Sequence, residues 1–250
     1  MNDHINIIKA PAKMQFPIRA GKVHVSEETK RNIEHHWQEI NQNNMFFRGT
    51  LYRMNDVELT EDELTIGMKE TDYAHHLYSK NNRLSKEEAC PILAPVAFVI
   101  SSDGYLLFGR MGSQTAKPGV IQCAGGGIDQ EDVSFNEIDV VSNVTREVEE
   151  ELGINVKDDR EVKAFFADKL IFPDRKVWLA IVFQLHSTFT KDQLVKQVHR
   201  HNEKLRNKGE TPEFEEVITV KNNPAAIRQF LQDHHKELIR YLRPFLYNML

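Results

Sequence analysis

The sequence predicts an α/β protein, because strand-like and helix-like segments alternate along its length. Short apolar runs such as residues 92–100 are typical of buried strands. Segments such as residues 26–41, with apolar side chains every three or four positions, are typical of helices. Turn residues, mainly Gly, Asn and Asp, separate the two kinds of segment. Mixing of this kind favours an α/β or α+β class.

Composition limits the range of functions. The chain has 250 residues, 40% hydrophobic and 28% charged, as expected for a soluble globular protein. Its net charge of −5 argues against a nucleic-acid or anionic-membrane partner. Residues 92–100 are too few to span a bilayer, and the N-terminus lacks the pattern of a signal peptide. Cys90 and Cys123 form no CxxC motif, so we expect a reducing, cytoplasmic location.

The first ninety residues are interpreted as a smaller α+β region, and residues 91–250 as the main domain. Ser26 opens a predicted helix at residues 26–41. Two predicted strands follow, separated by a turn at Asn55 and Asp56. The expected elements of this region are a helix at 26–41, strands at 47–54 and 63–69, and a short helix at 72–82.

The main domain is expected to contain strands, a glycine-rich loop and three helical segments. Pro244 is expected to break or kink the last helix. The predicted strands are 94–101, 105–111, 120–127, 162–171, 176–187 and 215–220, and the predicted helices are 136–152, 191–208 and 223–250.

The segment "TREVEEELGI" at residues 145–154 carries the strongest chemical signal. Its Glu147, Glu150 and Glu151 have the spacing i, i+3 and i+4, so they share one face of a helix. Three like charges on one face repel each other, and a hard divalent cation relieves the repulsion. Mg²⁺ or Mn²⁺ suits such oxygen ligands, and no His/Cys cluster indicates zinc. The alternative is a solvated acidic helix end.

A glycine cluster precedes this helix. Residues 123–129 read "CAGGGID", which places three glycines at the end of a predicted strand. Glycines allow the backbone to approach a ligand closely. A glycine turn followed by clustered carboxylates favours a site for a metal ion and a pyrophosphate group.

These motifs resemble the signature of the Nudix hydrolases, G-x5-E-x7-R-E-U-x-E-E-x-G-U with U apolar. Its glycines match Gly125 and Gly126, and its second half is complete in Arg146, Glu147, Val148, Glu150, Glu151, Gly153 and Ile154. The first half departs from the pattern. Six extra residues separate Gly126 from Arg146, and the position eight before Arg146 is Ile138 rather than Glu. Ala124 stands where the family usually has Pro.

The resemblance implies a Nudix α/β/α sandwich with a mixed sheet over residues 91–250, and a metal-dependent pyrophosphatase. Its implied metal ligands are Glu147, Glu150, Glu151 and the carbonyl of Gly125. Glu150 and Glu151 are the implied catalytic carboxylates, and Arg146 would orient them.

Substrate-binding residues are predicted near the glycine loop. Arg110, Lys117 and Gly126 are the candidates for contact with phosphate, although Arg110 could equally be a surface residue. Glu215 or Glu216 is a further candidate base, with a solvated strand entrance as the alternative.

The N-terminal region is similar in order and spacing to the UDP-sugar pyrophosphatase branch of the superfamily. The residues that carry this similarity are Trp37, Phe47, Gly49, Tyr52, Thr71, Asp72, Tyr73, Pro118 and Gly119. This resemblance implies hydrolysis of a UDP-hexose to UMP and a sugar 1-phosphate. ADP-ribose or another nucleotide sugar remains an alternative, as does a non-catalytic module that senses a nucleotide. The expected partner is a small nucleotide diphosphate, and the oligomeric state is left open, a homodimer included.

Aromatic and histidine residues allow two readings. Phe46, Phe47 and Tyr52 could stack on a base, but buried strand aromatics are commoner. Adjacent residues of a helix point about 100° apart, so the histidine pairs are interpreted as surface or capping residues. These pairs are His35–His36, His75–His76 and His234–His235.

Overall fold

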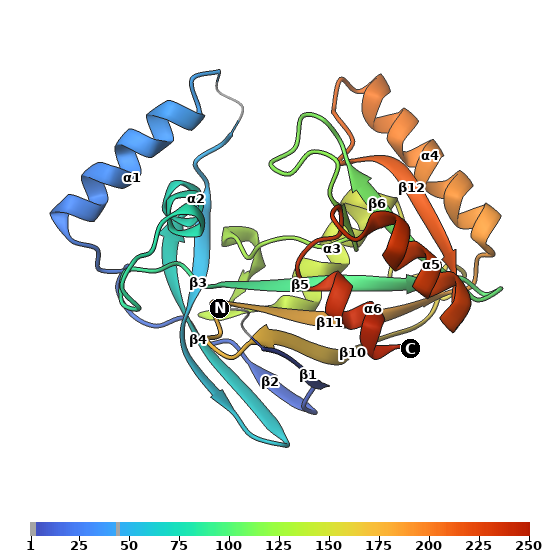
Figure 1. Ribbon diagram of the computed structural model, residues 1–250, viewed down its shortest axis with the longest axis horizontal. Helices are drawn as coiled ribbons and strands as arrows, with labels where there is room; N and C mark the ends of the chain where they lie inside the picture. Colours follow the sequence, from blue (N-terminus) through green and yellow to red (C-terminus); the bar gives the residue numbers. More distant parts are fainter. Residues whose placement is uncertain (1–3, 44–45) are drawn as a thin grey trace.

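A mixed β-sheet forms the centre of the protein (Figure 1), and this confirms the predicted α/β class. The structure is a computed structural model that describes residues 4–43 and 46–250. Among these residues the sheet has ten strands, and β11 pairs with β5 in parallel. The main strand order is β1 (Ile5–Lys9), β10 (Val162–Pro173), β11 (Trp178–Ser187), β5 (Ile92–Ile100), β3 (Thr50–Leu59), β4 (Glu63–Asp72) and β2 (Lys13–Gln15). A branch from β5 adds β6 (Tyr105–Met111), β7 (Ile121–Gln122) and β12 (Phe214–Lys221).

Helices cover both faces of the sheet, because alternate side chains of its strands enter two separate cores. In β11, Leu179 and Ile181 enter one core, whereas Ala180 and Val182 enter the other. The first core lies under α3 (Val140–Leu152) and α4 (Lys191–Asn207). The second lies under α5 (Pro224–His234) and α6 (Leu242–Asn248). The sheet is therefore the middle layer of a three-layer arrangement (Figure 1).

Strands from the first ninety residues continue this sheet. β1 pairs with β10 along its length, and β3 meets β5 where Arg53 is in register with Ile92. Two further helices, α1 (Glu27–Ile40) and α2 (Tyr73–Asn81), contact each other on the side of β3 and β4 (Figure 1). The division of the chain at residue 91 stays a prediction.

The turn predicted at Asn55 and Asp56 is wrong. β3 runs through both residues, with a bulge between Met54 and Asp56 in its pairing with β4. The bulge accommodates the extra polar residue, and the Asp56 carboxylate accepts hydrogen bonds from Arg19. The chain turns only after Leu59, where the Thr60 amide donates to the Glu63 carbonyl.

The helix predicted from residue 136 begins four residues later. Phe135 and Asn136 have φ angles of 47° and 64°, which a right-handed helix does not tolerate. They form the tip of a hairpin between β8 (Val133–Ser134) and β9 (Glu137–Ile138). Asp139 then caps α3 by accepting from the amides of residues 141 and 142.

Two other details differ from expectation. The last helical segment is interrupted between His234 and Leu242, and Pro244 lies in the first turn of α6. A proline is tolerated there because that amide has no partner within the helix. His75 is buried rather than exposed, with ring contacts to Thr71 Oγ1 and the Glu88 carbonyl. Across residues 4–43 and 46–250, no helix is both long and apolar enough to cross a membrane.

Candidate active site

Helix α3 places its carboxylates against the glycine loop because its opposite face is anchored in the core. Val144, Val148 and Leu152 are fully buried and share that apolar face. Glu151 is also buried, and its Oε2 accepts a hydrogen bond of 2.8 Å from the Gly125 amide. No donor among the described residues reaches Glu151 Oε1, which is buried without a partner. A buried carboxylate oxygen without a donor is costly unless a ligand completes it.

Gly125 is sterically required in the loop. It has a φ angle of 145°, and a Cβ there would collide with the Pro95 carbonyl. A Cβ at Gly126 would meet only the carboxylate of Glu147, 2.5 Å from its Oε1, and that flexible side chain could move away. The absence of a side chain at Gly126 therefore lets the Glu147 carboxylate lie against the loop in its present position.

Arg146 lies among several carboxylates. Its guanidinium nitrogens are 3.1 Å from Asp132 Oδ1, 3.2 Å from Glu147 Oε1 and 3.2 Å from Glu150 Oε2. Partial burial acts to lower the pKa of Arg146, but these charges outweigh it and the pKa is raised. Arg146 therefore does contact Glu147 and Glu150, and its most buried partner is Asp132.

Asp132 is the first of two site residues that the sequence did not predict. Its side chain is only 2% exposed, and it accepts hydrogen bonds from Asn143, Arg146 and the Asp129 amide. It stands six residues after Gly126, which is the spacing of the first acid in the resemblance drawn above. Counting backwards from Arg146 pointed instead to Ile138.

The six extra residues therefore lie after the acid, where they form the β8–β9 hairpin. The acids that flank Ile138 have other roles. Glu137 accepts a hydrogen bond from the Phe16 amide, and Asp139 caps α3. Counting forwards from the glycines would have found Asp132.

Glu213 is a second missed residue. It lines the same cavity as Glu151, and its carboxylate reinforces the raised pKa of Glu151. Backbone pairing holds it there, since the Glu213 carbonyl accepts from the Gly112 amide at 2.8 Å. Glu216, one of the two bases suggested from sequence, instead bonds Arg110 at 2.6 Å. Glu213 and Glu215 are both exposed, but Glu213 lines the cavity beside Glu151 and Glu215 does not. Neither the motif nor the spacing distinguished Glu213 from its neighbours.

The electrostatics of the cluster favour a bound cation. Burial raises the pKa of Glu147 to about 7, with repulsion from Glu150 and Glu213 adding to the effect and Arg146 opposing it. Burial also raises the pKa of Glu151 well above its ordinary value, reinforced by Glu213 and Glu147. Positive charge brought to these carboxylates would reverse both shifts.

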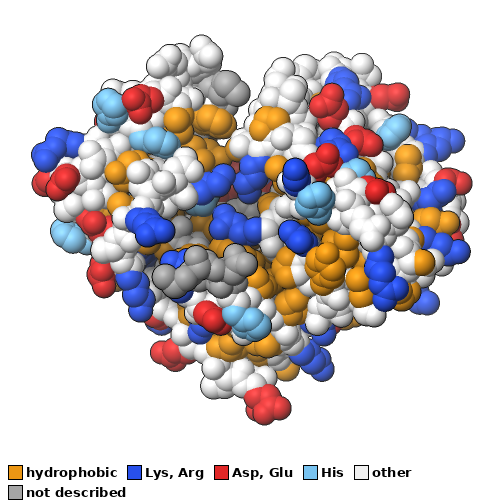
Figure 2. Space-filling view, viewed as in Figure 1, with side chains coloured by type: hydrophobic (Ala, Val, Ile, Leu, Met, Phe, Trp, Pro, Cys, Tyr) orange, Lys and Arg blue, Asp and Glu red, His pale blue; other side chains and the backbone are white. Residues whose placement is uncertain are grey.

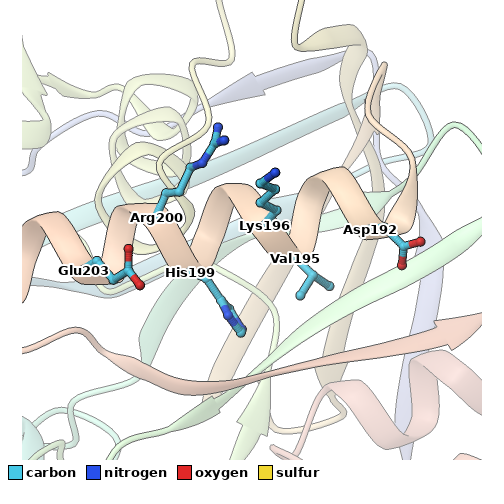
Figure 3. Close-up of a pocket in the computed structure, with 6 residues that line it drawn as sticks. All are labelled: Asp192, Val195, Lys196, His199, Arg200 and Glu203. Carbon is cyan, nitrogen blue, oxygen red and sulfur yellow. The ribbon is translucent and has the colours of Figure 1, made fainter.

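An open cavity of about 530 Å³ exposes this cluster to solvent. Its walls come from α3, from α4 and from the segment that precedes β12, and they include Arg146, Glu147, Glu150, Glu151, His201 and Glu213. A second hollow, of about 460 Å³, lies on α4 (Figure 3). All six side chains that line it come from that single helix, and it contains none of the predicted site residues.

The carboxylate and carbonyl oxygens of the site suit a hard divalent ion, although the side chains are not arranged around one. Among the described residues, no three His, Cys, Asp or Glu side chains are arranged to hold a metal ion. Arg146 is in contact with Glu147 and Glu150 in this arrangement. The unpartnered Glu151 Oε1 and the carbonyl of Gly125 offer oxygen ligands of the kind that Mg²⁺ and Mn²⁺ prefer.

The two cationic side chains predicted to contact phosphate differ in their partners. Arg110 bonds Glu216 at 2.6 Å, Glu237 at 2.9 Å and the Gly119 carbonyl at 3.2 Å. Its predicted contact with substrate would require release of these bonds. The Lys117 side chain has no ion pair or hydrogen bond within residues 4–43 and 46–250.

The aromatic residues of the N-terminal region are divided between core and surface. Tyr52 is buried in β3, whereas Phe47 is 87% exposed. Phe46 contacts Tyr73, with ring centroids 6.1 Å apart. Tyr73 in turn lies near the acidic cluster, because Glu213 contributes to raising its pKa after burial.

Comparison with solved structures returns likenesses of low identity. DR0079 from Deinococcus radiodurans has a TM-score of 0.41 and 12% identity, over 63% of this chain and 82% of that one. A MutT protein from Methanosarcina mazei Go1 has a TM-score of 0.34 and 18% identity, over 63% and 91%. A bifunctional NMN adenylyltransferase/ADP ribose pyrophosphatase from Francisella tularensis, complexed with AMP and a Mn ion, has a TM-score of 0.37 and 11% identity, over 74% and 62%.

No protein-family model matches the sequence, and no curated protein matches it. All three TM-scores are below 0.5, so these likenesses carry no argument about function. The functional interpretation therefore depends on the geometry of the site.

Proposed function

We propose that the protein is a metal-dependent hydrolase that cleaves a nucleoside diphosphate linked to another moiety. One observation carries this proposal. Glu147, Glu151 and Glu213 are gathered beside Gly125 and Gly126 at an open cavity, with one carboxylate oxygen buried and unpartnered. A solvated acidic helix end would leave Glu151 exposed, whereas here Glu151 is buried and Glu147 is half-buried.

The charge of the site determines which chemistry it can perform. A diphosphate would be repelled by these carboxylates alone, so the reaction needs cations between protein and substrate. Glu147, Glu150, Glu151 and the Gly125 carbonyl would hold Mg²⁺ or Mn²⁺, which would neutralise the substrate oxygens and lower the pKa of bound water. Gly126 would leave room for the phosphates.

Proton transfer and the orientation of the carboxylates are assigned to side chains of the protein. Glu151, with Glu213 beside it in the cavity, is our candidate for accepting the proton of the attacking water. Asp132 forms an ion pair with the guanidinium of Arg146, and Arg146 in turn orients Glu147 and Glu150. Asp132 and Arg146 are positioning residues in this scheme.

A UDP-sugar is the first candidate substrate, hydrolysed to UMP and a sugar 1-phosphate. The support is the order of N-terminal motifs and the position of Tyr73, which lies beside the site and contacts Phe46. ADP-ribose and other nucleotide sugars are the alternatives within the same chemistry. A nucleotide-sensing module without turnover is the alternative outside it.

The test is a substrate panel with product identification. The protein is incubated with UDP-glucose, ADP-ribose and other nucleotide sugars, with Mg²⁺ or Mn²⁺, and the products are separated by chromatography. We expect UMP from UDP-glucose, abolished by EDTA and by Glu151→Gln. The matched control is Glu203→Gln, an exposed glutamate on α4, which should retain full turnover. No turnover of any substrate, with Mn²⁺ binding demonstrated, would favour the sensing module.

A further inference from the structure

A second charged region lies apart from the carboxylates. Lys and Arg side chains gather at the centre of one face, between the part of the molecule that contains α2 and the part that contains α5 and α6 (Figure 2). Electrostatic interactions place Lys80, Lys117 and Arg240 near one another and near His76. We call these four residues the basic hollow.

Three separate parts of the chain form the basic hollow. α2 contributes His76 and Lys80, which are four positions apart and so share one face of the helix. Lys117 comes from the loop between β6 and β7. Arg240 follows a short segment that pairs with β7, since the Ile239 amide donates to the Ile121 carbonyl at 3.0 Å. Tertiary structure, rather than a local run of basic residues, therefore brings the charges together.

The cations of the basic hollow lack counter-charges. Within residues 4–43 and 46–250, Lys80, Lys117 and Arg240 have no ion pair, and Arg240 is 5.5 Å from the ring of Trp178. Arg110, one strand away, shows the contrast, because it bonds both Glu216 and Glu237. His76 Nδ1 is buried, and no hydrogen-bond partner reaches it from the part of the chain that the structure describes. Like charges held together with an unpartnered polar atom are expected where an anion binds.

The solvation of these groups supports a concave site. Burial lowers the pKa of Lys117 to about 8, and Lys80 and Arg240 lower it further in the same direction. Burial also lowers the pKa of His76 to about 4, with Lys117 as the next cause. Arg240 is exposed, and its guanidinium lies 5.5 Å from the ring of Trp178.

One face of α2 connects the basic hollow to the acidic site. Tyr73, His76 and Lys80 recur at helical spacing, and the rings of Tyr73 and His76 are 6.0 Å apart. Tyr73 is close enough to Glu213 for the carboxylate to affect its pKa. Seven residues of helix rise separate Tyr73 from Lys80, which is about 10 Å. A substrate that extended from the carboxylates along this face of α2 would reach the cations.

We propose that the basic hollow is an anion subsite that binds a phosphoryl group of the substrate through Lys80, Lys117 and Arg240. This inference rests on the proposed function for the identity of the substrate, but not for the binding of the anion. The phosphoryl group has two sources. It is either one of the two phosphates that are cleaved, or a separate phosphate carried elsewhere on the substrate.

Calorimetric titration with inorganic phosphate tests the subsite without any need for turnover. The full chain is titrated in EDTA, beside Lys117→Met and Arg240→Met. The matched controls are Lys196→Met and Arg200→Met, which remove exposed cations from α4 (Figure 3). We expect the first two variants to weaken phosphate binding at least tenfold and the controls to remain within twofold. Absence of binding to the wild type, or equal binding by all five proteins, would overturn the proposal.

A labelling experiment provides a second readout on the unaltered chain. Lysines are acetylated with limiting acetic anhydride at pH 8, and each site is quantified by mass spectrometry. Phosphate should protect Lys117 at least fivefold and leave Lys196 unchanged. Equal labelling of Lys117 with and without phosphate would contradict the proposal, whether or not the protein proves to be a hydrolase.

Kinetics with a matched pair of substrates distinguishes the two sources. ADP-ribose and ADP-ribose 2′-phosphate differ only by one phosphate outside the diphosphate. A raised KM of Lys117→Met for both substrates would assign the subsite to the cleaved diphosphate. A raised KM for the 2′-phosphate alone would assign it to the separate phosphate. Unchanged KM for both, with turnover intact, would overturn a role of the basic hollow in substrate binding.

Discussion

The acidic site on α3 and the basic hollow carry unbalanced charge of opposite sign. At the acidic site Glu147, Glu151 and Glu213 crowd together, with Arg146 as the nearby cation. In the basic hollow, cations crowd together, and no carboxylate of the described residues pairs with them. Both regions raise the energy of the folded protein when no ligand is bound.

Arg110 shows that the fold can balance its charges where no ligand is needed. Its guanidinium bonds two carboxylates and a backbone carbonyl. Charged groups that have no partner in the described residues, unlike Arg110, are therefore the ones that indicate where a ligand binds. A cation that suits the acidic site and an anion that suits the basic hollow are together the two halves of a metal–diphosphate complex.

The largest expected effect is on turnover. Glu151→Gln removes the charge that would bind metal and accept a proton, while preserving the size of the side chain. We expect turnover of the best substrate to fall about 1,000-fold, equivalent to about 4 kcal/mol in the activation barrier. Steady-state kinetics measures this loss, with Glu203→Gln as the control. A reduction of less than about tenfold would show that the buried carboxylate has no direct part in the reaction.

Asp132→Ala tests the ion pair between Asp132 and Arg146 in the acidic site. Removal of the carboxylate would leave Arg146 and Asn143 without their buried partner. We expect a loss of about 3 kcal/mol in the free energy of unfolding, measured by urea denaturation at pH 7. Asp129→Ala, which removes a more exposed carboxylate 3.5 Å from Arg146, should cost about 1 kcal/mol. Equal losses in the two variants would contradict the assignment of Asp132 as the main partner.

Glu147→Gln should stabilise the metal-free protein at neutral pH. The pKa of Glu147 rises from 4.5 to about 7 on folding, so the folded state binds its proton more tightly than the unfolded state does. Wild-type stability therefore declines as the pH rises through this window, and the variant avoids the decline. We expect a gain of roughly 2 to 3 kcal/mol at pH 8 and little gain at pH 4. Urea denaturation in EDTA measures both, and a loss of stability at pH 8 would contradict the account.

Lys117→Met should stabilise the protein with the opposite pH dependence to Glu147→Gln. The pKa of Lys117 falls from 10.5 to about 8 on folding, so the unfolded state binds the proton more tightly. The cost is present in full below pH 8 and disappears as the pH rises towards 10.5. We expect the variant to gain roughly 2 kcal/mol at pH 7 and much less at pH 10. A gain that did not change with pH would indicate improved packing rather than relief of charge repulsion.

The smallest effect is expected at the β8–β9 hairpin, which belongs to neither charged region. Phe135 at its tip is fully exposed. Phe135→Ser should change the free energy of unfolding by less than about 0.5 kcal/mol and leave turnover unchanged. A large loss of activity would show that the hairpin contacts the substrate.

Sequence reasoning could predict what local pattern determines. The "REVEEEL" run predicted α3 and the shared face of Glu147 and Glu151, because both follow from helical spacing. The predicted start of α3 was wrong. A short hairpin with two left-handed residues has no sequence periodicity that distinguishes it from a helical turn. Asp132 was missed because the six inserted residues lie between it and Arg146. Counting backwards from Arg146 therefore reaches Ile138, whereas counting forwards from Gly126 reaches Asp132.

The basic hollow and Glu213 were beyond prediction for a different reason. Lys80, Lys117 and Arg240 lie far apart in the sequence, and only tertiary structure brings them together. Glu213 is one of four glutamates between residues 210 and 216, and its backbone hydrogen bond with Gly112 fixes its position. Contacts of this kind depend on register and packing, which a single sequence does not specify.

Binding of Mn²⁺ to the substrate-free protein tests the central claim most directly. Electron paramagnetic resonance measures free Mn²⁺ during a titration of the wild type, Glu147→Gln, Glu151→Gln and the control Glu203→Gln. The account predicts saturable binding to the wild type and the control, and at least tenfold weaker binding to the two α3 variants. Equal binding by all four proteins, or none by the wild type, would contradict the claim that the buried carboxylates form a cation site.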